Sequence, residues 1–196
     1  MEKPNPSNAD AHASRRAGTP AGFTLIELVT TMALLLLIVM STAPSFAAIV
    51  ERSRLRTVVE RLRADITLTH TEALLRHRTV VLSFHRSEDG QEWCYGLSLA
   101  DRCDCRIASG PGACELDEGV STRVTGADSP GVRSAALPFA LNGGRLIVPG
   151  ARPTLTAGSA RFASAHGQAE VRVASTGRVR LCSPAGDQRL VSLEPC

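Results

Sequence analysis

The chain has 196 residues and a formal net charge of +3; hydrophobic residues make up 43% of it and aromatic residues only 4%. This length suits one globular domain with an appendage, and so small a net charge argues against wholesale nucleic-acid binding. Lys3 is the only lysine. The rest of the chain therefore lacks a P-loop lysine, a Schiff-base lysine and a Ser-Lys dyad.

The first 50 residues change character at Gly22. Residues 1–22 are polar, rich in small residues and proline, and basic at Arg15 and Arg16, whereas residues 23–50 are apolar and carry one charge, Glu27. Residues 28–50 contain no ionisable group and are long enough to cross a bilayer. In a secretory signal the apolar stretch precedes the cut, so a cut after Gly22 would keep this helix. An uncleaved signal anchor is the alternative.

Glu27 falls in about the first turn of the expected membrane helix. A carboxylate within a bilayer costs about 2.5–3.5 kcal/mol on insertion scales, so it needs a partner. A cut after Gly22 would create a free α-amine on Phe23, which a neighbouring subunit could offer to Glu27 during assembly. The alternative is that Glu27 lies at the depth of the lipid headgroups.

Residues 22–28, Gly-Phe-Thr-Leu-Ile-Glu-Leu, resemble the signature of the type IV pilin and type II secretion pseudopilin superfamily. The resemblance implies that a prepilin peptidase cuts after Gly22, removing residues 1–22 as a leader, and methylates Phe23. It also implies a single-pass protein of the bacterial inner membrane, with residues 23–50 as a transmembrane and assembly helix that binds other pilins. Pro44 fits this likeness, because a proline there would kink or locally open the helix.

Residues 51–78 are predicted to continue the same helix, from Phe23 to about His77, as an amphipathic segment. One stripe is apolar at helical spacing: Leu55, Val58, Val59, Leu62, Ile66, Ala73 and Leu74. Arginines occupy much of the remaining surface: Arg52, Arg54, Arg56, Arg61 and Arg63. These arginines form either a solvated face or contacts to neighbouring subunits in a filament.

Residues 79–196 are predicted to form a β-rich globular domain, which the resemblance places in the periplasm. The expected strands are Thr79–His85, Trp93–Leu99, Val132–Phe139, Arg145–Val148, Ala160–Ala165, Ala169–Ala174, Arg178–Cys182 and Arg189–Leu193. Ser109–Gly131 is expected to be a loop. The fold class is therefore α+β, a long N-terminal transmembrane helix packed on a C-terminal antiparallel β-rich domain of the pilin type.

Six cysteines follow the membrane segment: Cys94, Cys103, Cys105, Cys114, Cys182 and Cys196. Disulfides in an oxidising compartment are favoured over zinc, because no C-x-x-C pair occurs and no histidine lies at ligand spacing. Cys182 and Cys196 are the simplest pair. Cys103 and Cys105 would share a face on a strand and so have different partners.

The carboxyl-terminal third is the basic end, with eight arginines against three acids from Arg133 to Cys196. Val171 and Val173 alternate with Arg172, and Val179 and Leu181 alternate with Arg178 and Arg180. With a turn at Ser175–Gly177, this pattern predicts a hairpin with its apolar side chains facing the core.

On that hairpin, Arg178 and Arg180 share the outer face, where Arg172 joins them and Arg189 could extend the patch. Clustered arginines suit an anionic partner such as a phosphate backbone. The alternative is a charged face that discourages edge-to-edge aggregation.

Within the superfamily the chain is similar to the GspH/FimT group of minor pilins, on three elements. These are residues 93–97 (Trp-Cys-Tyr-Gly-Leu), residues 103–105 (Cys-Asp-Cys) and residues 176–182 (Thr-Gly-Arg-Val-Arg-Leu-Cys). Some proteins of the FimT type are associated with DNA capture through a Gly-Arg-x-Arg element, here Gly177 to Arg180. The resemblance implies weak, sequence-independent binding of double-stranded DNA for uptake in natural transformation.

No catalytic constellation is found. The chain has no G-x-S-x-G, no H-E-x-x-H and no Gly-rich loop between a strand and a helix. The acids between Glu88 and Glu118 lack a recognisable ligand spacing, which leaves a calcium site there as the weaker alternative. We expect no enzyme, no cofactor and no metal.

Three functions stay open. The chain is a minor pilin that starts or caps a type IV pilus, a DNA-binding member of the same group at the pilus tip, or the minor pseudopilin of a type II protein secretion system. A membrane-anchored periplasmic enzyme is the alternative from another class, and it is disfavoured by the missing catalytic groups.

Overall fold

The computed structural model describes residues 22–117, 120–151, 155–186, 189–190 and 192–196, with the backbone alone for residues 42–44. It divides the chain into two units, Met1–Thr42 and Ala43–Cys196, each described by itself below. The predictions for the leader and for a kink at Pro44 lie outside the described residues and side chains. The fold class is α+β, as predicted: one long helix followed by antiparallel sheets.

Helix α1 (Leu25–Arg76) begins in the first unit and matches the predicted helix to within two residues at each end. Thr24 caps its N-terminus, because the backbone N–H of Glu27 donates to Thr24 Oγ1 at 3.2 Å. The hydroxyls of Thr30, Thr31 and Ser41 donate to carbonyls one turn back in the helix. Bonds of this kind satisfy the hydroxyl groups within the helix itself, without a partner from outside it.

The first unit holds the apolar stretch of α1. Among the described residues this is the one helix long and apolar enough to cross a membrane, with a mean hydropathy of 2.3 in its most apolar window and no part of that window buried. Its large side chains, from Leu25 to Met40, are exposed in the isolated chain. Such a helix requires a bilayer or other helices to cover it.

In the second unit, α1 buries the predicted stripe. Leu55, Val59 and Leu62 are fully buried, and Ile66 is 1% exposed. Leu74 is the exception at 44% exposed, because it lies one position, about 100°, past the buried Ala73.

The helix ends in a left-handed residue, His77, whose φ is +49°. His77 N donates to Leu74 O, and Arg78 N donates to Ala73 O. This is the Schellman pattern, which satisfies the last carbonyls of a helix.

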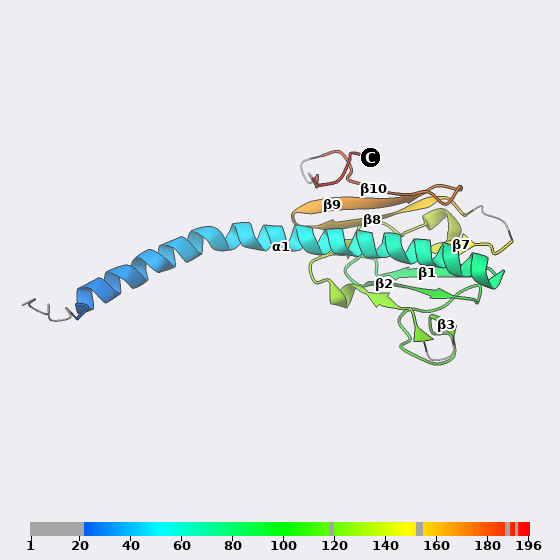
Figure 1. Cartoon of the computed structure of the whole chain (residues 1–196), viewed down its shortest axis with the longest axis horizontal. Helices are drawn as coiled ribbons and strands as arrows, with labels where there is room; N and C mark the ends of the chain where they lie inside the picture. Colours follow the sequence, from blue (N-terminus) through cyan, green and yellow to red (C-terminus); the bar gives the residue numbers. More distant parts are fainter. Residues whose placement is uncertain (1–21, 118–119, 152–154, 187–188, 191) are drawn as a thin grey trace, which may run out of the picture. The chain divides into compact units, whose positions relative to one another are not determined.

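Two four-stranded antiparallel sheets and one two-stranded sheet complete the second unit among the described residues (Figure 1). The first has the order β5-β2-β1-β7, with β1 (Val80–Arg86), β2 (Trp93–Ser98), β5 (Val124–Thr125) and β7 (Arg145–Val148). The second has the order β10-β9-β8-β6, with β6 (Arg133–Ser134), β8 (Gly158–Ser164), β9 (Gly167–Val173) and β10 (Val179–Cys182). In Figure 1 the second half of α1 crosses in front of the domain, with β8–β10 above it and β1 and β2 below. Helix and both sheets share one hydrophobic core.

A buried polar link ties α1 to the first sheet. The hydroxyl of Tyr95, a fully buried side chain, donates to Asp65 Oδ2 at 2.7 Å. Burial raises the pKa of Asp65, and the Tyr95 hydrogen bond and the Arg61 charge only partly oppose this shift. The link thus joins α1 to β2 by a hydrogen bond inside the core of the second unit.

The cysteines form three disulfides: Cys94–Cys105, Cys103–Cys114 and Cys182–Cys196. The predicted pair is confirmed, and so are the different partners of Cys103 and Cys105. Residues 103–105 are not a strand, however, so a shared strand face is not the reason. No cysteine is free, which leaves no thiolate for a zinc site.

Most predicted strands are confirmed to within two residues, with two exceptions. Val132–Phe139 shortens to β6, because the chain bends at residues 135–136, where the Ser134 hydroxyl donates to Ala136 O; it then turns at Phe139, with φ +51°, into the short helix η2 (Ala140–Asn142). Arg189–Leu193 forms no strand among its described residues; its contact to a strand is a single bridge from Arg189 to Gln168.

The predicted loop Ser109–Gly131 is also wrong in part. It contains β3 (Glu115–Asp117), β4 (Val120–Ser121), β5 and the short helix η1 (Gly126–Asp128). The hydroxyl of Thr122 accepts from Leu97 N and donates to Leu97 O. It thus takes the place of a neighbouring strand at this point on the edge of β2. Side-chain contacts of this kind leave no periodic signal in the sequence.

Candidate functional site

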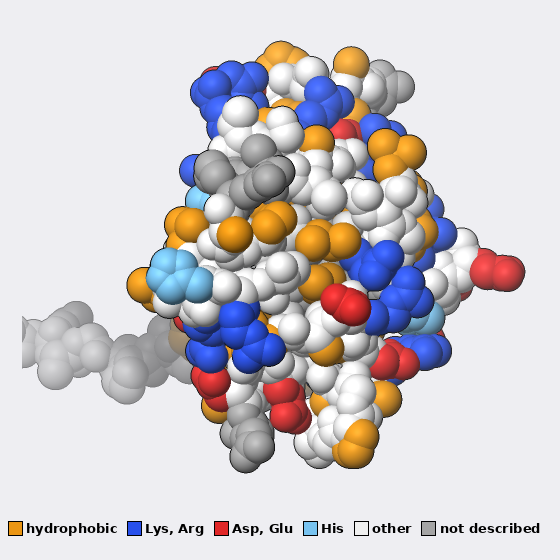
Figure 2. Space-filling view, turned by 90° about the vertical axis from the view of Figure 1, so that its right-hand side faces the viewer, with side chains coloured by type: hydrophobic (Ala, Val, Ile, Leu, Met, Phe, Trp, Pro, Cys, Tyr) orange, Lys and Arg blue, Asp and Glu red, His pale blue; other side chains and the backbone are white. Residues whose placement is uncertain are grey.

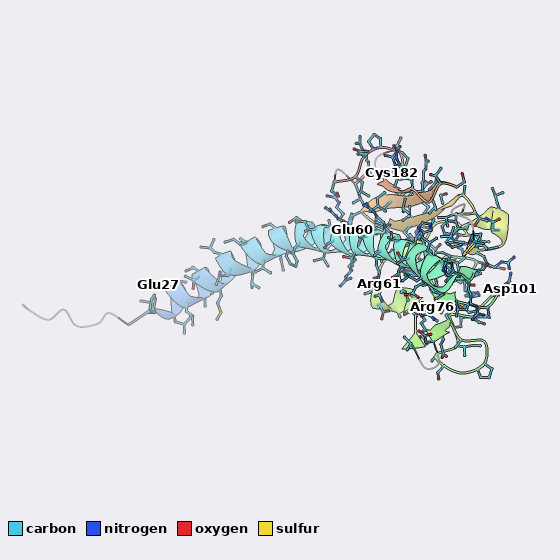
Figure 3. All side chains as sticks on the ribbon, turned by 45° about the vertical axis from the view of Figure 1, so that its right-hand side comes forward. Glu27, Glu60, Arg61, Arg76, Asp101 and Cys182 are labelled. Carbon is cyan, nitrogen blue, oxygen red and sulfur yellow. A yellow bond between two sulfur atoms is a disulfide. The ribbon has the colours of Figure 1, made fainter. Side chains whose placement is uncertain are left out.

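The first candidate site is the start of α1. Residues 22–24 precede the helix without regular structure, and a Cβ added at Gly22 would meet no atom within 4 Å. Phe23 is 83% exposed. Figure 3 shows Glu27 in the first turn of the helix, and its carboxylate makes no hydrogen bond or ion pair within the described part of the chain. The Glu27 carboxylate is therefore available to a group from another molecule.

Thr24 is a residue of this site that sequence reasoning missed. Thr24 and Glu27 stand at the spacing of a capping box, in which the first residue caps the N–H of the fourth. The structure shows the half in which Thr24 Oγ1 accepts. The threonine at this spacing before an apolar run was the signal that could have placed the helix start.

The second candidate site is the β9–β10 hairpin. Arg180 lies opposite Arg172, and Val179 opposite Val173, in an antiparallel register. Gly177 supplies the left-handed turn, with φ +84°. Val171 and Val173 are buried, as predicted.

The exposed arginines of the hairpin differ in their partners. The guanidinium groups of Arg178 and Arg180 make no hydrogen bond or ion pair within the described residues, although their backbones pair with β9 and the turn before β10. Arg172 Nε donates to Glu170 Oε1 at 2.8 Å, and its Nη1 donates to the carbonyl of Cys196 at 3.3 Å. Arg178 and Arg180 thus keep their charge for an external anion.

Glu170 is a carboxylate that sequence reasoning left unassigned. It is 2% exposed and accepts from Arg161 on β8 as well as from Arg172. Burial raises its pKa, but hydrogen bonds from Arg172 and Arg161 outweigh that, so its pKa lies below the ordinary value. Glu170 therefore stays ionised and neutralises part of the arginine surface.

A groove of about 650 Å³ runs beside the hairpin. Its walls come from α1, from β10 and the residue before it, and from the tail that Cys182–Cys196 ties down. The charged residues that line it are Arg56, Glu60, Arg63, Arg172, Arg178, Arg180 and Glu194. Figure 2 shows Lys/Arg side chains gathered at the top of the molecule, the side on which β10 lies in Figure 1. We call the groove lined by these charged residues the arginine groove.

The arginine groove does not include every predicted residue. Arg189 does not line it and instead bridges to Gln168, four residues before Arg172 on β9. At about 3.3 Å per residue this is roughly 13 Å away along the strand. Arg56 and Arg63 line the groove from α1 and were missed, since strand and helix positions that meet only in the fold share no spacing in the sequence.

Fold and sites together describe a subunit with an exposed apolar helix and a small disulfide-bonded β-rich domain. A sequence model of the family described as "Type II transport protein GspH" matches residues 58–195, more than half of the chain. The chain belongs to the GspH family. The match begins after the apolar half of α1, so it is independent of the Gly22–Leu28 signature.

Two kinds of solved structure are similar in overall arrangement. The type IV minor pilin FimU of Pseudomonas aeruginosa has a TM-score of 0.45 at 16% identity, over 69% of this chain and 96% of that one. The minor pseudopilin EpsH of the type 2 secretion system of Vibrio cholerae has a TM-score of 0.43 at 13% identity, over 68% and 99%. Scores this low carry no argument about function. No curated protein sequence matches the chain.

Proposed function

We propose that the chain is a minor pilin-like subunit, made as a precursor and cut by a prepilin peptidase after Gly22. In this proposal α1 holds the mature protein in the bacterial inner membrane, residues 79–196 lie in the periplasm, and assembly proceeds through α1. Its support is the family membership, the exposed segment Gly22–Thr24, which has no regular structure, and the exposed apolar helix behind it.

Glu27 supplies the assembly contact in this proposal. Its carboxylate has no hydrogen bond or ion pair to the residues that the structure describes, and it lies three residues from the Thr24 cap. The α-amine of Phe23 on a neighbouring subunit would neutralise the carboxylate, and the pair would then enter a low-dielectric helix bundle together. The resemblance-based methylation of Phe23 belongs to the same proposal.

The arginine groove adds a second role, binding of double-stranded DNA. The observation that carries it is the pair Arg178, directly before β10, and Arg180, on β10, whose side chains are exposed and make no hydrogen bond or ion pair to the described residues. Guanidinium groups donate to phosphate oxygens in a fixed fork, and contacts to phosphates read no sequence. With so few contacts, one subunit binds DNA weakly, with a dissociation constant on the order of 10⁻⁴–10⁻⁶ M at physiological salt.

The test uses the full chain in detergent micelles and a fluorescent DNA duplex, measured by anisotropy at low and moderate salt. Wild type should bind with an affinity that falls as salt rises, and Arg178→Ala with Arg180→Ala should remove most of that binding. Equal binding by the double variant, or no salt-sensitive binding by wild type, rules out DNA as the ligand of these arginines.

A minor pseudopilin of a type II secretion system is the second candidate, favoured by the description of the matched family. Deletion of the gene separates the candidates. Loss of surface pili or of transformation supports the first, whereas retention of secreted proteins in the periplasm with normal pili supports the second.

A further inference from the structure

The arginines of the groove lie on two of its walls, and only one of these two walls is the hairpin. Strand β10 ends the second sheet in the order β10-β9-β8-β6. The residue that follows β10, Ser183, pairs with the tail: Ser183 N donates to Glu194 O, and Cys196 N donates to Ser183 O. The stretch from Arg178 to Leu181 instead borders the groove, across from the flank of α1.

Arg56 and Arg63 form the helix wall. They are seven residues apart, which places them on one flank, about 10.5 Å apart along the helix axis. Glu60 lies between them and forms an ion pair with Arg56, Nε to Oε1 at 2.7 Å. Figure 3 shows Glu60 on the side of α1 turned toward Cys182, and Arg61 on the other side. Within the described residues the Arg63 guanidinium has no ion pair or hydrogen bond, and the only side-chain bond to this residue is the one its carbonyl accepts from Thr67.

The lining of the groove limits the kind of ligand. It contains five arginines, two glutamates and no aromatic residue. Proteins that bind single strands stack the bases on aromatic side chains, and this groove has none to offer. What it offers is guanidinium donors on two facing walls, which suits a chain of phosphates followed along its backbone.

We infer that Arg56 and Arg63 of α1 form, with Arg178 and Arg180, a two-walled seat for the sugar–phosphate backbone of duplex DNA. This inference rests on the proposed DNA binding and deepens it. The helix that anchors the subunit also carries half of the ligand contacts, and Glu60 limits the affinity by neutralising Arg56. Duplex binds more tightly than a single strand of equal length, because its charge density is higher and the groove gains nothing from exposed bases.

The experiment compares three double variants of the full chain in detergent: Arg56→Ala with Arg63→Ala, Arg178→Ala with Arg180→Ala, and Arg78→Ala with Arg133→Ala as control. The control removes the same charge at exposed positions outside the groove. We expect the helix and strand pairs each to lower the slope of log affinity against log salt by about 2 and to weaken binding on the order of tenfold at low salt. The control should change neither by a comparable amount.

The outcomes separate the two proposals. If the strand pair weakens binding and the helix pair behaves like the control, the two-walled seat is wrong while DNA binding by Arg178 and Arg180 stands. If the strand pair also behaves like wild type, both proposals fail. A single-stranded probe that binds more tightly than the duplex overturns the backbone-only seat.

Glu60→Gln provides a gain of function that misfolding cannot imitate. It frees Arg56 and removes a negative charge from the groove, so duplex affinity should rise several-fold. Unchanged or weaker binding by Glu60→Gln contradicts a role for Arg56 in the seat. Far-ultraviolet circular dichroism and a thermal melt of each variant verify that the fold is retained.

Discussion

The start of α1 and the arginine groove differ in how their residues come together. Gly22, Phe23, Thr24 and Glu27 lie within six consecutive positions, and their relation follows from one helix start and its cap. The groove joins α1 to β9, β10 and the tail, which are more than 100 residues further along the chain. A site built from neighbours in sequence survives changes in the domain, whereas a site built by packing depends on the fold that assembles it.

The largest expected effect is at the start of α1. Gly22→Val should block the cut completely, so that the membrane-bound protein keeps its leader and does not assemble. The glycine has open space around it, so the substitution leaves the fold of the domain intact and affects only the recognition of the cut site by the peptidase. Intact mass and N-terminal sequencing measure the outcome. Normal cleavage of Gly22→Val would break the assignment of this site.

Glu27→Gln should leave processing and membrane insertion intact and sharply reduce assembly. It removes the charge that is proposed to pair with the Phe23 amine, and it makes insertion of the helix easier by up to about 3 kcal/mol. Cross-linking of subunits in membranes, with Thr30→Ala as a matched control in the same helix, measures assembly. Assembly at the wild-type level would favour the alternative that Glu27 lies at headgroup depth.

Cys182→Ser with Cys196→Ser should destabilise the domain by about 3 kcal/mol, because the bond closes a loop across 14 positions. Chemical denaturation of the full chain in detergent measures it. The tail forms part of the arginine groove, so salt-dependent DNA binding should change as well, while cleavage after Gly22 should not. A change in cleavage would contradict the independence of the two sites.

Glu170→Gln gives the smallest expected effect and has a definite pH dependence. The pKa of Glu170 is lowered in the folded state, so its stabilising contribution is present above its ordinary pKa, 4.5, and is lost as pH falls through the lower folded value. The variant should be less stable by about 1–2 kcal/mol at pH 7, with a smaller loss of stability on acidification. Denaturation at pH 7 and below pH 4 measures both. An unchanged acid response would show that Arg161 and Arg172 do not hold the carboxylate ionised.

The same substitution connects stability to the groove. Glu170→Gln removes the partner that neutralises Arg172, so duplex DNA should bind somewhat more tightly although the domain is less stable. Arg161→Gln is the matched control. It removes the hydrogen bonds that Arg161 of β8 donates to Glu170, and it adds no charge to the groove. Weaker binding by Glu170→Gln would mean that Arg172 acts through its fixed position and not through its free charge.

Much of the fold could be predicted from local patterns. The helix Leu25–Arg76 follows from an uninterrupted apolar run and then a stripe at helical spacing, and β7 follows from its boundaries in the chain. The errors lie where side chains decide the backbone. The Thr122 hydroxyl bonds to the edge of β2 from within a predicted loop, and the Ser134 hydroxyl bonds to Ala136 O where the chain bends and the predicted strand stops.

The hairpin with Arg178 and Arg180 could be predicted as well, because alternation on a strand sets the face of each side chain. The helix wall could not. From the sequence, Arg56 and Arg63 are predicted to lie on a solvated helix face or to contact neighbouring subunits, because no residue near them along the chain indicates a partner within the same subunit. Arg189 reads as an extension of the patch because it is close in sequence, yet its bridge to Gln168 takes it to the other end of β9.

The sequence by itself determined the features that depend on order along the chain: an apolar helix with one carboxylate behind Gly22, and an alternating arginine strand near the end. These follow from helix and strand periodicity, which any short segment carries. The tertiary structure alone decided which arginines share a groove, which of them Glu170 neutralises, and how the first four cysteines pair. Those relations follow from the packing of α1 between two sheets, which brings distant residues within the few ångströms over which charges and hydrogen bonds act.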